Sequence, residues 1–560
     1  MNTHHENNNS GISRRDALKL AGLSMGGLSM GGLAVGGTAG VQAAGKQSKP
    51  VDEFYPTRDK TDRYSYFEKL KAFHPGTPPE ADEMRITFLG SMIPPVRRAQ
   101  QEMSIFVEVG RVKDPVTQQW RAKDQFVFDC GSGVCANYGA MGIPYSEMDK
   151  VFLCHLHGDH MSDLCHIYCF GPSAGRYSPL FVWGPNASGI TYTDPTKPAG
   201  NVYGPYDDGL TTYCQMLRAA MRWHSESFSF QNTSYQSYPA KAPTKDSWGL
   251  PVEPIPVRDP RAPYVDRYND DDYVDSPCDG YALIPIELDW TKDGKDANGV
   301  SNEDNIAYQN AATQVKITHF PVVHCRRGSI GYKLEWTTPS GSVLTMIYTS
   351  DTKPETISID QAINGGKGVD VFIHEMVVPP EVWAMKNAGL AAPPAIPTPE
   401  WNAAVAQFQM VQNSSHTPQG AFGYLLSLLE GAHTRPRLTV ATHFPVADDT
   451  VDCAFNSVLA HCPNLGKLGE KITWSFDNMV ISVTSRKIQQ FRAIVPDYGW
   501  SPPVVIPGDV NPAKYWTWDE TKTKQVGDPF AQIDMSNVIP AEVTDADGNV
   551  IQVNYRTDGY

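Results

Sequence analysis

The hexapeptide HLHGDH at residues 155–160 directly follows the apolar run VFLC at residues 151–154. Three imidazoles and one carboxylate within six residues, just past a β-like run, offer donors of the kind that bind zinc and similar transition metals. Side chains alternate along an extended backbone, so the first two histidines can bind one ion, while the aspartate and the third histidine can face a second. A polar loop that happens to be rich in histidine is the alternative, but scattered histidines rarely show this spacing. The motif therefore predicts a dinuclear hydrolase site.

The hexapeptide resembles the HxHxDH signature of the metallo-β-lactamase superfamily, and its surroundings are similar to the branch that contains tRNase Z, related phosphodiesterases and a group of arylsulfatases. The resemblance runs from about residue 85 to residue 483. It includes ITFLG at residues 86–90 and FVFDCG at residues 126–131, and it reaches the metal motif at the spacing that this branch uses. It implies an α/β (α+β) fold, an αββα metallo-β-lactamase sandwich of two mixed sheets with large insertions and with the metals at one edge.

Three further ligand positions follow from the same resemblance. His324 ends a predicted strand and is soon followed by a Gly-Tyr strand, as is the third metal histidine of the family. Asp351 lies in the sequence TSDT, which resembles the family's YSGDT motif with Ser350 in place of glycine. This substitution can alter the turn but leaves the ligand. His443 lies in THFP, where relatives of tRNase Z have THFS.

The resemblance implies that seven side chains bind two zinc ions, with Mn²⁺ or iron as alternatives. The first ion is expected to bind His155, His157 and His324, and the second to bind Asp159, His160 and His443, with Asp351 and a hydroxide bridging the pair. Metal binding lowers the pKa of water toward neutrality, so hydroxide can attack phosphorus, sulfur or a carbonyl carbon while the second ion neutralises charge on the substrate.

Two more elements of the branch supply acid–base chemistry. Glu375 lies in the sequence IHE, which resembles the IHEA element, and His416 lies in SHT, which resembles the HST element. We expect His416 to protonate the leaving oxygen, with its pKa adjusted by Glu375. Asp159 completes the predicted catalytic set. The alternative for His416 is a surface residue that caps a helix expected at residues 418–429.

Predicted substrate contacts are fewer. Arg326 and Arg327 follow a metal ligand and could clamp an anionic ester, although neighbours on a strand point to opposite sides, so that at most one would reach the site. We take Arg326 as the candidate. Trp383 and Trp401 lie in a Pro/Ala-rich insertion at residues 376–414. This insertion could form a lid over an apolar or aryl group, or its aromatic side chains could only pack the loop.

Composition and charge favour a globular protein that does not bind nucleic acid. The 560 residues carry a net charge of −15, and no Lys/Arg-rich block is present. Such a chain offers no surface that would release counterions from a nucleic acid. A further insertion at residues 186–313 lacks the basic character of the arm that grips tRNA in tRNase Z. Its acidic run at residues 270–275 lacks the Gly and the Glu of an EF-hand, which favours a solvated turn over a calcium site.

The first 44 residues are interpreted as an export signal. Arg14 and Arg15 lie in SRRDALK, which resembles a twin-arginine motif, and a Gly-rich, weakly apolar run and small residues follow. The predicted partner is the twin-arginine translocase, and the predicted location is periplasmic or secreted, without stable membrane insertion. The predicted domain order is a signal at 1–44, an N-terminal wrap at 45–84, the hydrolase domain at 85–485 and an extended tail at 486–560.

Ten cysteines lack the CxxC spacing of a zinc ribbon, which indicates core positions or one or two disulfides. Cys154 and Cys325 adjoin predicted ligands and are expected to pack behind the metals rather than bind them.

Together these features predict an exported dinuclear hydrolase that cleaves a phosphodiester or (aryl) sulfate ester of a small molecule. The alternatives are a lactonase or β-lactamase, which attacks a carbonyl carbon, and a non-catalytic metal-binding scaffold. Whether the protein is a monomer or a homodimer is left open.

Overall fold

The computed structural model describes residues 70–114, 118–176, 178–193, 196, 201–221, 223–224, 283–446, 448–465 and 472–495, with short stretches at 517–518, 525–526, 541–544 and 547–553. The predicted signal at residues 1–44, the larger part of the predicted wrap and the acidic run at residues 270–275 lie outside the described residues.

A nine-stranded mixed sheet forms one layer of the core. In spatial order its strands are β1 (Lys71–Phe73), β18 (Ile488–Ala493), β17 (Met479–Val483), β2 (Met84–Gly90), β3 (Ser104–Lys113), β4 (Trp120–Phe128), β5 (Lys150–Phe152), β6 (Leu180–Pro185) and β9 (Leu283–Leu288). Neighbours from β18 to β4 are antiparallel, whereas β4, β5, β6 and β9 run parallel to one another. The C-terminal ends of these parallel strands therefore meet at one edge.

A seven-stranded mixed sheet forms the second layer. Its strands are β10 (Ile306–Asn310), β11 (Val315–Pro321), β12 (Ile330–Thr337), β13 (Val343–Tyr348), β14 (Val371–Glu375), β15 (Leu438–Thr442) and β16 (Ile472–Trp474), in that spatial order. The strands from β10 to β13 are antiparallel, and those from β13 to β16 are parallel. The polar segments after β13, β14 and β15 thus emerge side by side.

Aromatic side chains fill the space between the two sheets. Phe152 of β5 stacks on Trp183 of β6 with ring centroids 4.5 Å apart, and it meets Tyr332 of β12 edge-on at 5.5 Å. Phe126 of β4 lies 5.3 Å from Tyr308 of β10. All five side chains are fully buried, and burying an apolar side chain of this size contributes about 1.5–3 kcal/mol. The inner faces of the two sheets therefore form one shared core.

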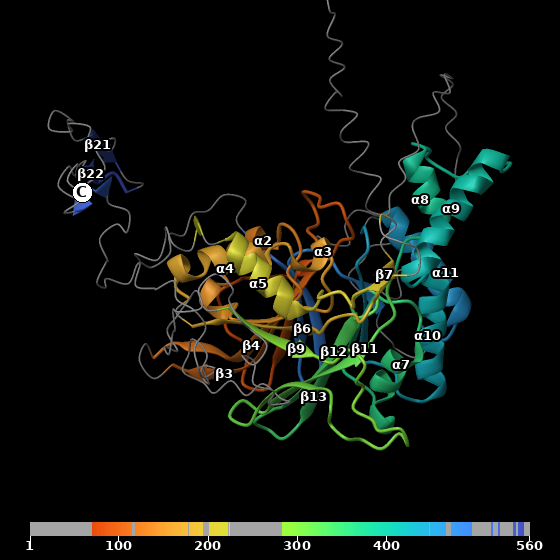
Figure 1. The fold of residues 1–560 in the computed structure, drawn as a ribbon, viewed down its shortest axis with the longest axis horizontal. Coiled ribbons are helices and arrows are strands. Elements are labelled where there is room, and N and C mark those ends of the chain that lie inside the picture. The colour runs from red at the N-terminus through yellow and green to blue at the C-terminus, as the bar shows by residue number, and fades with distance from the viewer. Residues whose placement is uncertain are drawn as a thin grey trace, which may run out of the picture.

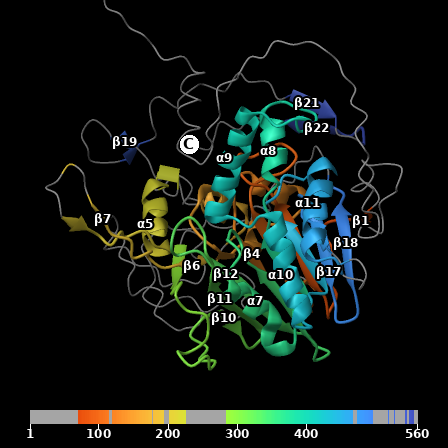
Figure 2. The same ribbon diagram turned by 90° about the vertical axis from the view of Figure 1, so that its right-hand side faces the viewer.

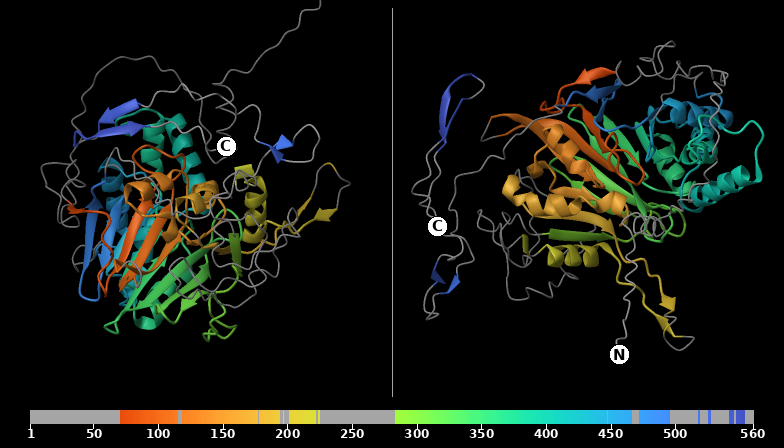
Figure 3. Two further views of the ribbon diagram at one scale, coloured as in Figure 1. Left: turned by 90° about the vertical axis from the view of Figure 1, so that its left-hand side faces the viewer. Right: turned by 90° about the horizontal axis from the view of Figure 1, so that it is seen from above.

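Helices cover the outer faces (Figures 1 and 2). On the side of the nine-stranded sheet lie α2 (Val134–Ala140), α4 (Leu164–Phe170) and α5 (Leu210–Ala220); on the side of the seven-stranded sheet lie α7 (Thr356–Ile363), α10 (Gln419–Gly431) and α11 (Asp448–His461). A second apolar cluster joins Phe372 of β14 to Phe422 of α10 and Phe455 of α11. Figure 3 shows the orange and blue strands of the first sheet beside the green strands of the second. The predicted αββα sandwich is confirmed.

The remaining elements are short or lie outside the four layers. They are α3 (Gly158–Met161), α8 (Pro380–Asn387), α9 (Pro399–Ser415), 3₁₀ turns at Tyr145–Glu147, Pro172–Ala174 and Asn364–Gly366, and two-stranded pairs of β7 (Tyr192–Thr193) with β8 (Val202–Tyr203), β19 (Thr517–Trp518) with β20 (Gln525–Val526) and β21 (Ala541–Thr544) with β22 (Val550–Val553). Within the described residues, no helix combines the length and apolar character that a membrane span requires.

Two predicted elements differ from the structure. The single strand expected at residues 471–483 is two strands, β16 and β17, which belong to different sheets. Asn478 between them adopts a left-handed backbone conformation (φ 62°), which strand residues do not share. The helix expected at residues 160–170 is divided into α3 and α4, because the backbone N–H of Asp163 donates to the carbonyl of Cys130 (2.9 Å) instead. Strands β9 and β10 fall within residues 186–313, and each is an edge strand of one sheet.

Candidate metal centre

Seven donor side chains come together where strands of both sheets end. They are His155 and His157 after β5, Asp159 and His160 in α3, His324 after β11, Asp351 after β13 and His443 after β15. Glu375, the last residue of β14, lies between the ends of β13 and β15. Because β13, β14 and β15 are parallel, their C-terminal ends place three polar side chains on the same edge.

Three histidines form the first cluster. Nε2 of His155 lies 3.1 Å from Nδ1 of His157, and that atom lies 3.2 Å from Nε2 of His324. Nδ1 of His324 lies 2.8 Å from the carbonyl oxygen of Ser415, which can only accept, so Nδ1 donates and Nε2 keeps its lone pair. Three converging imidazole nitrogens suit a four-coordinate zinc ion with one position open.

Two carboxylates and two histidines form the second cluster. Nε2 of His160 lies 3.4 Å from Oδ2 of Asp159 and 3.4 Å from Oδ1 of Asp351. Nε2 of His443 lies 3.2 Å from Oδ2 of Asp159. The other carboxylate oxygen of Asp351, Oδ2, lies 3.7 Å from Nε2 of His324 in the first cluster. Asp351 is therefore the one of the seven whose two oxygens face both clusters.

Unpaired buried atoms show that these residues fit metal ions. Nε2 of His160 and Oδ1 of Asp351 are buried and have no hydrogen-bond partner within the described part of the chain. A buried polar atom without a partner costs about 1–3 kcal/mol, which coordination of a cation would offset. The geometry thus groups the seven side chains into the two ligand sets expected from the sequence, and these sets can hold two metal ions.

The electrostatics of the centre favour positive charge. Burial alone would lower the pKa of His443, but the carboxylates of Asp351 and Asp159 raise it to about 10. Burial would raise the pKa of Asp351, yet His443 and His160 hold it well below its usual value. Burial holds the pKa of His155 well below its ordinary value, so this imidazole is neutral and ready to bind a metal. Divalent cations would supply the positive charge that the two carboxylates require.

Asp129, which sequence reasoning did not assign, orients the second cluster. Its Oδ2 lies 2.8 Å from Nδ1 of His160 and accepts the hydroxyl of Tyr348 (2.8 Å), and its Oδ1 accepts the backbone N–H of Cys154 (2.9 Å). A carboxylate on the far nitrogen of a ligand histidine fixes the ring and makes it more basic. The available signal was its place at the end of a buried strand, before Gly131.

Ser350 keeps the turn that a glycine would form before the bridging ligand. Its backbone has φ 55°, the left-handed conformation that glycine adopts without strain. Its hydroxyl lies 3.3 Å from Oδ2 of Asp129 and 3.4 Å from Nδ1 of His160. The replacement of glycine therefore leaves Asp351 in position.

Glu375 and His416 form a pair beside Asp351. Nδ1 of His416 lies 2.9 Å from Oε2 of Glu375 and 3.9 Å from Oδ2 of Asp351. Burial would lower the pKa of His416, but the Glu375 carboxylate raises it above the ordinary value. Glu375 also accepts the backbone N–H of Thr352. A third group of donors is also close enough to hold an ion: His324, Asp351, Glu375 and His416. However, His324 and Asp351 already belong to the other two clusters, and Glu375 is already hydrogen-bonded.

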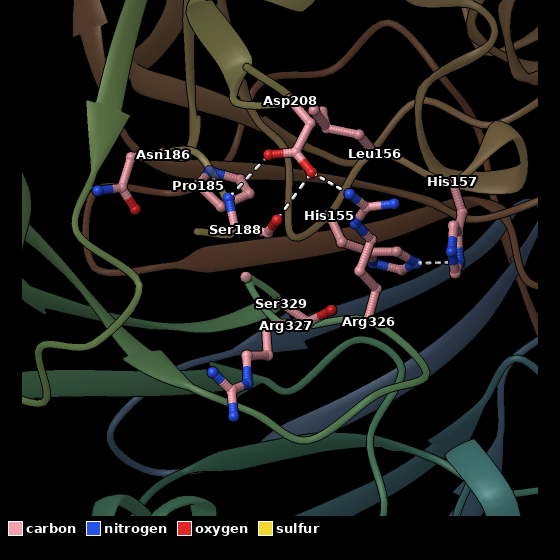
Figure 4. Close-up of a pocket in the computed structure, with 11 residues that line it drawn as sticks. His155, Leu156, His157, Pro185, Asn186, Ser188, Asp208, Arg326, Arg327 and Ser329 are labelled. Carbon is pink, nitrogen blue, oxygen red and sulfur yellow. Dashed lines mark hydrogen bonds and ion pairs between the residues drawn. The ribbon is translucent and has the colours of Figure 1, made fainter. Parts of the chain in front are cut away.

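A cavity of about 270 Å³ adjoins the first cluster and contains both arginines (Figure 4). Arg326 pairs with Asp208 and lies over the ring of Tyr206 at 5.4 Å. Arg326 and Arg327 lie in a turn between β11 and β12 and not on a strand, so the alternation of strand side chains does not apply to them, and both line the cavity. Asp208 offsets the charge of Arg326, whereas Arg327 is exposed and has no ion-pair partner in the described part of the chain.

The two cysteines beside the ligands differ from each other. Cys154 is buried, as expected of a residue that packs behind the metals. Cys325 is exposed, and its Sγ lies 3.5 Å from Nε2 of His157, so its expected position behind the metals is wrong. No disulfide joins any two of the nine described cysteines; the tenth, Cys278, lies outside the described residues.

The two tryptophans of the second insertion also differ. Trp383 of α8 stacks on Phe408 of α9 with ring centroids 5.1 Å apart, and it lines a cavity of about 550 Å³. Trp401 is half-buried near the start of α9 and lines neither of the two cavities described.

Sequence comparison relates parts of the chain to RNA-processing enzymes. The chain is 28% identical over 102 residues to ribonuclease BN of Enterobacter sp. (strain 638), which is 18% of this chain and 31% of that protein. It is 35% identical over 60 residues to ribonuclease BN of Citrobacter koseri, which is 11% of this chain and 20% of that protein. The chain thus spans about a third or less of the length of these relatives. No family model matches the chain.

Solved structures were also compared. The metallo-β-lactamase fold protein YhfI from Bacillus subtilis is 13% identical, with a TM-score of 0.36, and the match covers 72% of this chain and all of that one (100%). Human tRNase Z, short form, is 15% identical, with a TM-score of 0.34, and the match covers 71% of this chain and 99% of that one.

The chain has two mixed sheets packed face to face, helices on both outer faces, and a cluster of histidine and aspartate donors at the strand ends. This is the αββα fold of the metallo-β-lactamases, with a centre that can hold two metal ions.

Proposed function

We propose that the protein is an exported, dinuclear metal-dependent hydrolase that cleaves a phosphodiester or sulfate ester of a small molecule. The observation that carries the proposal is the His416–Glu375 pair, which lies 2.9 Å apart beside Asp351 and next to the two donor clusters. A hydrolase needs ligands for its metals and a separate proton donor for the leaving oxygen. This edge of the sandwich supplies both.

Each side chain has a defined part in this proposal. Divalent ions held by the two clusters would acidify water and offset the negative charge of the substrate. Glu375 accepts from Nδ1 of His416, so Nε2 is the atom of His416 that can deliver a proton to the leaving oxygen. Asp351 faces both clusters and fixes their separation. Asp129 and Ser415 hold His160 and His324 in the orientation that exposes Nε2.

The choice of a small substrate rests on charge and on space. The net charge of −15 disfavours a polyanion such as RNA, and cavities of about 270 and 550 Å³ are of the size that small-molecule sites have. RNA is the competing substrate class, because the sequence relatives are named ribonuclease BN. A lactone or β-lactam is less favoured, because the sequences around Glu375 and His416 resemble elements of the phosphodiesterase-like branch.

A substrate screen tests the proposal. The purified protein, loaded with zinc or manganese, should hydrolyse an aryl phosphodiester or an aryl sulfate faster than a lactone or a precursor tRNA. Preferential cleavage of precursor tRNA would refute the small-molecule assignment, and preferential cleavage of the lactone would refute the ester assignment. Elemental analysis should find close to two ions per chain. Asp351→Ala should lower metal content and activity together, because Asp351 faces both clusters.

Export is a separate part of the proposal and has its own test. Replacing Arg14 and Arg15 by lysine should leave folded, metal-loaded protein in the cytoplasm, because the export receptor reads the arginine pair. Fractionation of cells that produce the wild-type and variant proteins measures this directly. Unchanged export of the double variant would contradict the twin-arginine interpretation.

A further inference from the structure

We propose that the cavity beside α8 binds an apolar, aromatic part of the substrate that carries or adjoins a negative charge. We call it the α8 cavity; its volume is about 550 Å³, and it is lined by Ile93, Pro94, Pro95, Arg97, Ala99, Gln100, Val378, Val382, Trp383, Lys386, Asn387, Pro445, Val446 and Thr450. The inference rests on the proposed function and deepens it, because it names the class of group that the ester bears.

The position of the α8 cavity ties it to the metal centre. Pro445 and Val446 follow the ligand His443 by two and three residues, and Val378 follows Glu375 by three. Gln100 fixes this wall, since its Nε2 donates to the carbonyl of Phe444 (3.1 Å) and its Oε1 accepts the N–H of Val446 (2.9 Å). The α8 cavity is thus lined by residues two or three positions from His443 and Glu375, and in this proposal a substrate whose reacting bond lies at the metals extends an attached group into it.

The walls of the α8 cavity suit an aromatic ring. Val378 and Val382 are buried apolar side chains, and the indole of Trp383 forms another part of the wall. Trp383 is held by its stack on Phe408 of α9, at an interplanar angle of 15°. A fixed indole beside branched aliphatic side chains offers an aryl group both a flat partner and apolar surroundings.

The charges at the rim select the sign of the ligand. Arg97 and Lys386 line the α8 cavity and are both exposed, while the other polar lining residues, such as Asn387 and Thr450, are neutral. None of the lining residues is an aspartate or a glutamate. In a chain with a net charge of −15, a cavity lined by Arg97 and by no carboxylate favours an anionic group. The cavity thus fits an aryl group with a phosphate, sulfate or carboxylate nearby.

Calorimetric titration with naphthalene-2-sulfonate tests this inference without turnover, because the carbon–sulfur bond of a sulfonate is not hydrolysed by an esterase. The zinc-loaded, full-length protein should bind the probe, and Trp383→Ala should weaken binding at least tenfold. Trp401→Ala is the matched control, because Trp401 lies on α9 and outside the cavity. Equal binding by wild type and Trp383→Ala would overturn the proposal, as would an equal loss in both tryptophan variants.

Two further variants separate binding from folding and from charge. Val446→Phe fills part of the cavity and keeps the side chains of Trp383 and Phe408, so it should weaken binding even if Trp383→Ala fails to fold. Arg97→Ala should weaken binding of the sulfonate about threefold but not that of the neutral 2-naphthalenemethanol, while Arg98→Ala, outside the cavity, should change neither. Full affinity in Val446→Phe, or equal effects of Arg97→Ala and Arg98→Ala on the sulfonate, would contradict the assignment.

The binding result is independent of whether the ester assignment is right. If the protein binds the sulfonate through Trp383 but hydrolyses no ester, the reaction class is wrong and the α8 cavity assignment stands. If it hydrolyses esters, yet neither Trp383→Ala nor Val446→Phe changes probe affinity, the reaction class stands and the cavity assignment is wrong.

Discussion

Nδ1 of His160 lies 2.8 Å from Oδ2 of Asp129, and both side chains are completely buried. The contact leaves Nε2 of His160 facing Asp159 and Asp351 in the second donor cluster. Asp129 directly follows β4, and His160 lies in α3. Their contact therefore joins the end of a core strand of the first sheet to the helix that carries two of the seven donors. We therefore expect Asp129 to affect metal binding although it is not one of the seven donors.

Asp129→Asn should weaken metal binding about 10- to 100-fold. One carboxylate oxygen accepts from His160 and Tyr348 and the other accepts from the backbone N–H of Cys154, whereas an amide keeps only one acceptor oxygen. Titration of the metal-free variant with zinc, followed by calorimetry, measures this. Asp124→Asn is the control, since Asp124 is a buried carboxylate that pairs with Lys150 rather than with a ligand. If both variants bind zinc as wild type does, Asp129 has only a structural part.

Ser350→Gly should keep full metal content and a stability within about 1 kcal/mol of wild type. The glycine relieves a left-handed backbone conformation worth about 1–2 kcal/mol, but it removes the hydrogen bond of the hydroxyl, worth about 1 kcal/mol. Ser350→Val should lose about 2 kcal/mol or more, because a β-branched residue tolerates this conformation poorly. Denaturant unfolding and metal analysis of both variants provide the test. Equal stability of the two variants would show that the turn is not strained.

Stability should depend on pH through Glu108 of β3. Burial raises the pKa of Glu108 from 4.5 to about 7, against the lowering effect of Arg85, whose guanidinium lies 3.7 Å away. The folded protein therefore holds a proton that the unfolded chain releases at lower pH, so this stabilising contribution is present below about pH 4.5 and is lost as the pH rises through 7.

Glu108→Gln should accordingly match wild type in Tm near pH 5 and exceed it near pH 8.5, since the amide carries no charge to bury. Thermal unfolding at the two pH values measures the difference. Glu381→Gln, at an exposed position of α8, should show the same difference from wild type at both. A constant gap between wild type and Glu108→Gln would contradict the burial argument.

Local sequence patterns predicted most of the fold. Strands such as β2 and β13 have runs of β-branched and aromatic residues bounded by turns, and the ligand motifs lie at their ends, so sequence alone indicated a layered α/β architecture. The assignment of residues 471–483 failed because two short strands of similar composition follow one another. Only tertiary pairing separates β16, next to β15, from β17, next to β2.

The orientation of side chains at the site was harder to predict from the sequence. Arg326 and Arg327 were placed on a strand, but they lie in a turn where alternation does not apply. The pairing of Arg326 with Asp208 joins residues 118 positions apart, so no local signal reports it. For the same reason the motif FVFDCG, which contains Asp129, does not predict its contact with His160. The two residues meet only when β4 and α3 pack together.

His416→Ala should separate the chemistry of the leaving group from that of the metals. Its Nδ1 is held by Glu375 at 2.9 Å, so Nε2 can act as the proton donor, and the residue is not part of the two clusters of seven donors. The variant should keep its metals and lose about 10²- to 10⁴-fold in turnover of an ester with a poor leaving group. A nitrophenyl ester needs little protonation and should lose much less.

The structure makes the alternative role of His416 specific. His416 is the C-cap of α9, whereas the N-cap of α10 is Pro418. If His416 only ends α9, His416→Ala should lower stability by about 1 kcal/mol and should affect the turnover of all substrates equally. Rates measured across a series of leaving groups therefore decide the matter. A steeper dependence of rate on leaving-group pKa in the variant than in wild type supports the acid role. Parallel dependences with metals retained would exclude it and assign His416 to substrate positioning or to helix capping.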